Sequence, residues 1–134
     1  MSPALEAGMI ARRASIHLAA AKIMVDYAGT TRSNADAGKL TMGVTTRRLL
    51  AWAETTRNGI QSARAFASTI VSGAASEDKA TLEMLEGTTL RSLHARIDGI
   101  VRGTIDPNAA PVDPKAQGGQ GPTALQFPDD NDTL

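Results

Sequence analysis

The residues best suited to chemistry lie in residues 45–54, where two threonines precede two arginines and the chain's single tryptophan. A threonine such as Thr45 can cap a helix, which places Arg47 in the first turn of the helix that follows. A helix N-terminus favours anions, and a planar guanidinium adds a fixed positive charge beside it. This arrangement could therefore bind an anion such as a nucleotide phosphate. The alternative is a solvated arginine whose charge slightly opposes the helix dipole.

Other catalytic and metal-binding arrangements find little support in the sequence. The chain has no cysteine, which excludes disulfides, thiolate catalysis and cysteine-based zinc sites. His17 and His94 are far apart in sequence and have no second ligand at metal-binding spacing, so no metal site is expected. Asp26, His17 and a serine could be drawn as a hydrolase triad, but nothing places them together. Because neither a G-x-x-x-x-G-K-[ST] loop nor an acidic Walker B strand is present, we expect no catalytic activity from this chain alone.

The spacing of apolar residues predicts an all-α fold, a small bundle of four to five short helices. Aromatic residues make up only 3% of the chain, and a core of small aliphatic residues suits packed helices better than a sheet. We expect helices over residues 4–28 (with a break near Gly8 and a stop at Gly29), 46–57, 60–71, 77–86 and about 88–103. Residues 30–43 are predicted to form a turn-rich loop.

Individual positions in these helices carry further predictions. Ser76 is expected to cap the fourth helix, and Trp52 is expected in the core. The inward stripe of the third helix should consist of four residues, Ala63, Phe66, Ala67 and Ile70. Arg48 is expected on the surface.

Composition divides the chain into a helical domain, residues 4–103, and an acidic tail rich in proline and glycine, residues 104–134. From Asp106 onward five aspartates face only Lys115, so the tail has a net charge of −4 and the preceding body one of +4. We predict that the tail is disordered, and its acidic groups could meet the basic body or leave it to bind phosphates. Leu125 and Phe127 lie beside acids, as in short docking peptides; the alternative is a solvated extension without function.

The sequence also favours a cytoplasmic location. No apolar run approaches the ~18 residues that a bilayer span requires. Glu6, Arg12 and Arg13 interrupt any signal-peptide core. The absence of cysteine fits a reducing compartment.

Several short motifs follow one another in a distinctive order. An apolar helix ends in Thr31-Arg32, a polar loop follows, and Thr45-Thr46-Arg47 then begins a helix that continues to Trp52-Ala53-Glu54. An Ala-Phe-rich helix at residues 63–67 and a small acidic helix come next. This order, over about residues 16–102, resembles the C-terminal helical lid of AAA+ ATPases of the MoxR branch. The nearest resemblance is to the ATPase subunit of aerobic cobaltochelatase and its phage relatives, in which a proline stands at the position of Thr46.

The resemblance implies a specific role for Arg47. In that family this position is the sensor-2 arginine, which reaches from the lid to the γ-phosphate of ATP bound in an upstream domain. Arg32 could contact the nucleotide or a neighbouring subunit, or could simply complement the dipole at a helix end. ATP and Mg²⁺ would bind only together with the upstream nucleotide-binding domain, which would be a partner along with neighbouring ring subunits. The chain would then be the C-terminal lid part of a longer ATPase, coupling hydrolysis to motion.

A competing hypothesis is a stand-alone helical module that binds protein or, with less support, DNA. A helix-turn-helix could use four arginines, Arg47, Arg48, Arg57 and Arg64. The small basic excess and the helix rich in Ala and Ser after the Asn58-Gly59 turn argue against DNA.

Overall fold

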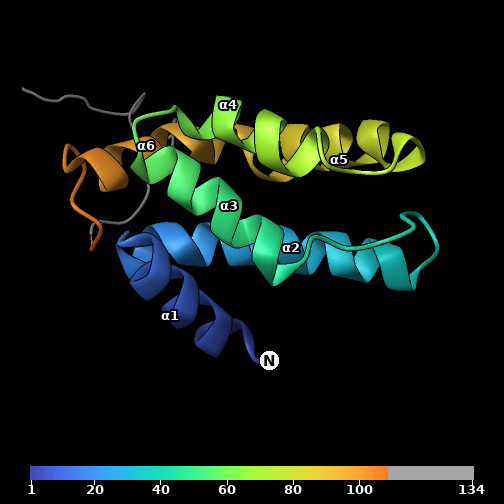
Figure 1. The fold of residues 1–134 in the computed structure, drawn as a ribbon, viewed down its shortest axis with the longest axis horizontal. Coiled ribbons are helices and arrows are strands. Elements are labelled where there is room, and N and C mark those ends of the chain that lie inside the picture. The colour runs from blue at the N-terminus through green and yellow to red at the C-terminus, as the bar shows by residue number, and fades with distance from the viewer. Residues whose placement is uncertain (109–134) are drawn as a thin grey trace, which may run out of the picture.

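The computed structural model describes residues 1–108, and every regular element in this part of the chain is helical, as predicted (Figure 1). The six α-helices are α1 (Pro3–Ala14), α2 (Leu18–Asp36), α3 (Thr46–Arg57), α4 (Ser62–Phe66), α5 (Ser76–Thr89) and α6 (His94–Arg102). A π-helical turn, η1 (Ala67–Val71), continues α4, and a 3-10 turn, η2 (Arg91–Leu93), precedes α6. The predicted docking residues Leu125 and Phe127 lie outside the described residues.

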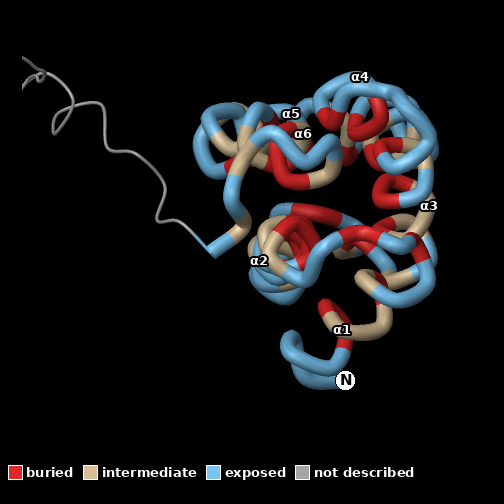
Figure 2. The backbone as a smooth tube through the Cα atoms, turned by 90° about the vertical axis from the view of Figure 1, so that its left-hand side faces the viewer, coloured by how far each residue is buried: buried red, intermediate tan, exposed pale blue. Residues whose placement is uncertain are grey.

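The helices form two layers with α3 crossing between them (Figure 1). One layer contains α1 and α2, the other contains α4, α5 and α6, and Figure 2 shows the buried residues gathered where the layers face each other. Trp52 is fully buried there. Its ring packs edge to face against Phe66 at 5.3 Å and Tyr27 at 6.3 Å between ring centroids. This geometry suits the quadrupoles of aromatic rings, and the prediction that Trp52 packs in the core is confirmed.

The first break in the chain lies at residues 15–17, so the prediction of a break at Gly8 is wrong. Ser15 adopts a left-handed conformation with φ of 58°, and the Ile16 N–H then donates to the Ala11 carbonyl at 3.1 Å. His17 caps α2, because its Nδ1 accepts the N–H of Ala19 at 3.0 Å. A histidine cap was not expected from the sequence.

Helix α2 continues past Gly29 to Asp36, so the predicted stop is wrong, and so is the first half of the predicted loop, residues 30–36. Its last turns contain polar side chains that bond back to the helix; for example, the Thr31 hydroxyl donates to the Ala28 carbonyl at 2.7 Å. Gly38, with φ of 80°, follows the end of the helix. The connection to α3 is therefore a shorter segment, residues 37–45, called the α2–α3 loop below.

Helix α3 begins and ends where the sequence predicts. The Thr45 hydroxyl accepts the N–H of Arg48 at 3.3 Å, which is the expected N-cap. Asn58 caps the other end, and Gly59 follows with φ of 114°. A substituent at Gly59 would be strained by that angle.

The predicted third helix is only partly α-helical. It begins at Ser62 and widens into the π-helical turn η1, where the Ser72 N–H donates to the Ala67 carbonyl at 2.9 Å. The wider turn changes the inward stripe: Phe66 and Ile70 are buried as predicted, whereas Ala63 and Ala67 are exposed and Ala65 is buried instead.

The last helices also differ in detail from the prediction. Ala75, not Ser76, occupies the N-cap of α5, and α5 runs through Gly87 to Thr89. The chain then turns at η2 before α6, which ends at Gly103 as predicted. Beyond it, the N–H groups of Thr104 and Ile105 both donate to the Gly99 carbonyl, so the chain stays against the body for a few residues.

Candidate functional site

Arg47 lies in the first turn of α3 with its side chain exposed. It forms no hydrogen bond or ion pair with any residue in the described part of the chain, residues 1–108. Its guanidinium therefore keeps all five N–H donors available, beside a helix N-terminus that itself favours negative charge. The predicted anion-binding residue thus lies where an anion could reach it.

An ion pair with a buried carboxylate supports this helix start. Glu6 on α1 is only 1% exposed, and its carboxylate accepts two hydrogen bonds from Arg32 on α2, at 2.7 and 2.8 Å. The same carboxylate accepts the hydroxyl of Thr46 at 2.7 Å. The Arg32 guanidinium, foremost, and the Thr46 hydroxyl lower the pKa of Glu6 despite its burial. These bonds join α1 and α2 to the first residue of α3.

The α2–α3 loop is held against α2 by two further bonds. The Nε of Arg32 donates to the Val44 carbonyl at 3.0 Å, and the Val44 N–H donates to the Thr31 hydroxyl at 2.9 Å. Gly43 lies so close to Arg32 that a Cβ on Gly43 would be 2.8 Å from the Arg32 Cα. Arg32 lies within α2, not at its end as the sequence suggested. All three of its side-chain nitrogens donate to the protein, Nε to the Val44 carbonyl and the two terminal nitrogens to Glu6.

A second carboxylate ties the same loop to the opposite layer. Asp78 on α5 accepts the N–H of Thr41 at 2.9 Å and the Thr41 hydroxyl at 2.6 Å. The bond from the hydroxyl, followed by that from the N–H, lowers the pKa of Asp78. The loop that leads to the start of α3 is therefore fixed to both layers of helices. Sequence reading found neither Glu6 nor Asp78, because their partners are 26 to 40 residues away.

Arg48 is partly buried, so the prediction that it lies on the surface is wrong. Its guanidinium donates to the carbonyls of Thr69, at 3.2 Å, and Ile70 in η1. Burial lowers the pKa of Arg48. Arg57 also donates to a backbone carbonyl, that of Ser15 at 3.1 Å, so two of the four arginines considered for DNA binding make contacts within the fold.

A serine, a histidine and a glutamate form a hydrogen-bonded chain elsewhere in the core. His94 Nδ1 lies 2.8 Å from the Ser62 hydroxyl, and its Nε2 lies 3.0 Å from the Glu86 carboxylate. The order matches that of a hydrolase triad, but Ser62 is 0% exposed and a substrate could not reach it. The chain instead joins α4, α5 and α6.

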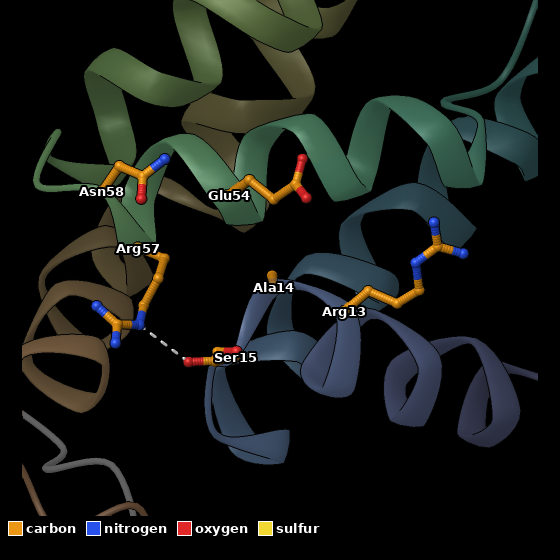
Figure 3. A pocket seen from close by; sticks show the side chains of 6 residues that line it. All are labelled: Arg13, Ala14, Ser15, Glu54, Arg57 and Asn58. Carbon is orange, nitrogen blue, oxygen red and sulfur yellow. Dashed lines mark hydrogen bonds between the residues drawn. The ribbon is translucent and has the colours of Figure 1, made fainter.

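An open pocket of about 540 Å³ lies at the far end of α3 from Arg47. Figure 3 shows the six residues that line it, Arg13, Ala14, Ser15, Glu54, Arg57 and Asn58. It lies between the α1–α2 turn and the last turns of α3, and its lining is mostly polar.

Neither a metal centre nor a membrane span was found in the described part of the chain. Within residues 1–108, no three histidine, cysteine or acidic side chains are grouped so that they could hold a metal ion. Over the same residues, no helix is long and apolar enough to cross a membrane.

The fold and the site define a class: a small domain, all-helical in its described part, with an exposed arginine that has no partner there, in the first turn of a helix whose inner face is buried. The chain matches the family model CbbQ/NirQ/NorQ C-terminal over residues 6–91, more than half of its length. It therefore belongs to the CbbQ/NirQ/NorQ C-terminal family, a C-terminal region of MoxR-type AAA+ ATPases. A comparison with curated proteins found no match. The nearer resemblance to cobaltochelatase stays a prediction.

Proposed function

We propose that this chain closes over ATP bound by an upstream nucleotide-binding domain and couples its hydrolysis to domain motion, with Arg47 as the residue that contacts the γ-phosphate. Family membership supports the role of a lid part of an AAA+ ATPase. The observation that carries the finer proposal is the exposed Arg47 side chain, which has no partner within residues 1–108. A surface arginine with no structural contact gains nothing from a helix start, where the dipole disfavours it, so a ligand would account for its position.

The other residues of the site act on Arg47 through position. Glu6 and Arg32 fix the Thr46 hydroxyl and the Val44 carbonyl, so the first turn of α3 has a defined place on the body. We therefore propose Arg32 as a positioning residue whose half-exposed guanidinium can still meet the nucleotide or a neighbouring ring subunit. The family that the sequence resembles has a proline at the position of Thr46. A threonine has a physical reason to stand here, because its hydroxyl donates to Glu6, which a proline could not do.

ATP would supply the phosphate whose transfer to water drives the motion, and its Mg²⁺ would be held by the upstream domain. The chain's own contribution would be a single planar cation, placed by a rigid helix start. The N–H donors of a guanidinium form a planar fork that can bond two phosphate oxygens at once, which a lysine ammonium cannot match. Closing on the phosphate and releasing it afterwards would move the helical body relative to the upstream domain.

The decisive experiment is Arg47→Ala in the ATPase that contains this lid and its nucleotide-binding domain. We expect turnover to fall at least about tenfold, since arginine contacts to phosphoryl groups commonly supply much larger factors. Arg47→Lys should restore only part of the rate, because it keeps the charge and loses the fork. Arg64→Ala, which removes another exposed arginine on α4, is the matched control and should leave turnover unchanged. Unchanged turnover in Arg47→Ala, with a melting temperature equal to that of the wild type, would reject the assignment.

The size of the native gene product decides between the ATPase and a stand-alone interaction module. An antibody to this domain should detect a band well above the 14.0 kDa of this chain in extracts of the source cell. A band at that mass, with no separate nucleotide-binding subunit in its immunoprecipitate, would favour the stand-alone module.

A further inference from the structure

Arginines gather at the end of the molecule where three helices finish. The last turns of α1, α3 and α6 contain Arg13, Arg57 and Arg102, respectively. Arg13 and Arg57 line the pocket between the α1–α2 turn and α3, and Glu54 lies between them in the view of Figure 3. Arg102 is adjacent, since it donates to the carbonyls of Thr56, at 2.8 Å, and Ile60, at 3.1 Å. This group is called the basic end below.

The basic end has hydrogen-bond donors to spare. Arg57 uses only its Nε, which donates to the Ser15 carbonyl (Figure 3), so its two terminal nitrogens have no partner within residues 1–108. Arg13 makes no hydrogen bond to the part of the chain that the structure describes. Against these two guanidiniums the pocket lining offers one carboxylate, that of Glu54, and its net charge is positive. The pocket therefore suits an acidic group better than a basic or apolar one.

The chain itself contains an acidic segment after α6. Arg102, the last residue of α6, belongs to the basic end, and the described residues stop at Asn108. Residues 109–134 contain four aspartates against Lys115, and three of these, Asp129, Asp130 and Asp132, lie within four positions of one another. Its opposite charge makes this segment the best-matched occupant within the chain.

We propose that the acidic end of this chain, residues 129–134, binds in cis to the basic end, in the pocket between Arg13 and Arg57. About 20 residues separate Asn108 from Asp129, and a chain of that length can extend over at most roughly 70 Å, which is enough to reach the pocket. A tether of this kind gives an effective concentration of the order of a millimolar, so even a contact with a Kd of about a millimolar would be half formed. The contact is separate from Arg47 and does not rest on nucleotide binding.

The 134-residue chain allows a direct test because it contains no cysteine. A nitroxide on a single Thr133→Cys broadens amide signals near the tail's end. We expect the Ser15 and Asn58 amides to lose at least half of their intensity at about 0.05 M salt and to recover most of it at about 0.5 M, where charges are screened within a few ångströms. The amides of residues 37–45, at the other end of α2, should keep their intensity.

Charge variants show whether the pocket is responsible. Arg13→Glu should remove most of the broadening, and so should the combined Asp129→Asn, Asp130→Asn and Asp132→Asn. Glu54→Gln should increase it, because it removes the repelling carboxylate. Lys39→Glu is the matched control: the side chain is exposed in the α2–α3 loop, about 28 Å from the start of α2 by helix rise, and broadening should not change.

Three results would overturn the proposal. The first is an absence of broadening around the pocket, and the second is broadening that Arg13→Glu leaves intact. The third concerns a mixture of two proteins, one with the nitroxide but no ¹⁵N and one with ¹⁵N but no nitroxide. Full broadening in this mixture would mean that the tail binds a second copy instead.

Discussion

At the scale of single residues, Glu6 has a structural role that is unusual for an acidic side chain: it joins three helices from a buried position. It is an acid on an N-terminal helix, yet it is almost fully buried and accepts bonds from Arg32 and Thr46. Burying a carboxylate is unfavourable unless charge and hydrogen bonds compensate it, and here both do. The start of α3, and Arg47 with it, depends on an ion pair that the sequence pattern does not reveal.

Glu6→Gln should therefore destabilise the domain strongly. Breaking a fully buried pair costs ~3–5 kcal/mol; the Arg32 side chain is 38% exposed and stays partly hydrated, so we expect about 2 kcal/mol. For a domain of this size that corresponds to a fall in Tm of roughly 8–15 °C, measurable by circular dichroism. Glu83→Gln, an exposed acid on α5, is the control and should shift Tm by less than about 2 °C.

A double-mutant cycle tests whether the loss comes from the pair itself. Once Arg32→Met has removed the partner, adding Glu6→Gln should cost much less than it does alone. Equal costs in both backgrounds would mean that Glu6 stabilises the domain without Arg32.

At the scale of elements, local signals predicted α3 and long-range contacts decided the others. Thr45 at one end and Asn58-Gly59 at the other are local caps, and both ends of α3 were predicted from them. Helix α2 passes Gly29 because its last turns are anchored by the Arg32–Glu6 pair. The π-helical turn η1 has no local signature, and its freed carbonyls are satisfied by Arg48 from α3. These partners are brought together only by the tertiary fold.

The α2–α3 loop depends on Gly43 because its backbone passes directly over α2. A Cβ at Gly43 would lie 2.7 Å from the Arg32 Cγ and 2.8 Å from the Arg32 Cα, and the helix backbone cannot yield. Gly43→Ala should therefore lift the loop, weaken the two bonds of Val44 and lower stability by about 1–3 kcal/mol. The amide signals of Val44 and Thr46 should move, and hydrogen exchange at Val44 should accelerate.

Gly29→Ala is the matched control for this change, with the opposite expected sign. Nothing lies within 4 Å of a Cβ at Gly29, and the residue is inside α2, where alanine is favoured by up to ~1 kcal/mol. Tm should rise for Gly29→Ala and fall for Gly43→Ala. A Tm for Gly43→Ala that matches or exceeds that of the wild type would show that the loop has room for a side chain.

At the scale of the whole molecule, the fold class was predictable and the architecture of the site was not. Apolar spacing and low aromatic content were enough for an all-α bundle, and the Thr45 cap was enough to place Arg47 in a first turn. The support beneath Arg47 joins α1, α2, α3 and α5 across 26 to 40 residues. Periodicity describes which face a residue occupies, not which distant residue it meets.

Two carboxylates, Glu6 beneath the start of α3 and Asp78 at the α2–α3 loop, predict how the whole domain responds to acid. The pKa of Glu6 is lowered chiefly by Arg32 and that of Asp78 chiefly by Thr41. The unfolded chain protonates these groups near their ordinary values of 4.5 and 3.8, so in acid it binds more protons than the folded chain. Their contribution to stability is therefore complete above those values and disappears as pH falls toward the lowered ones.

Tm should accordingly stay nearly constant from pH 7 to about 5.5 and decrease steadily below about pH 5. The double variant Glu6→Gln, Asp78→Asn should start from a lower Tm at pH 7 but lose less of it between pH 7 and pH 3, because its loop contacts no longer titrate. Calorimetric melts of both proteins at half-unit pH intervals provide the comparison. Since both proteins have the same tail, titration of its aspartates contributes equally and cancels in the difference. An acid slope as steep in the variant as in the wild type would show that Glu6 and Asp78 do not control acid stability.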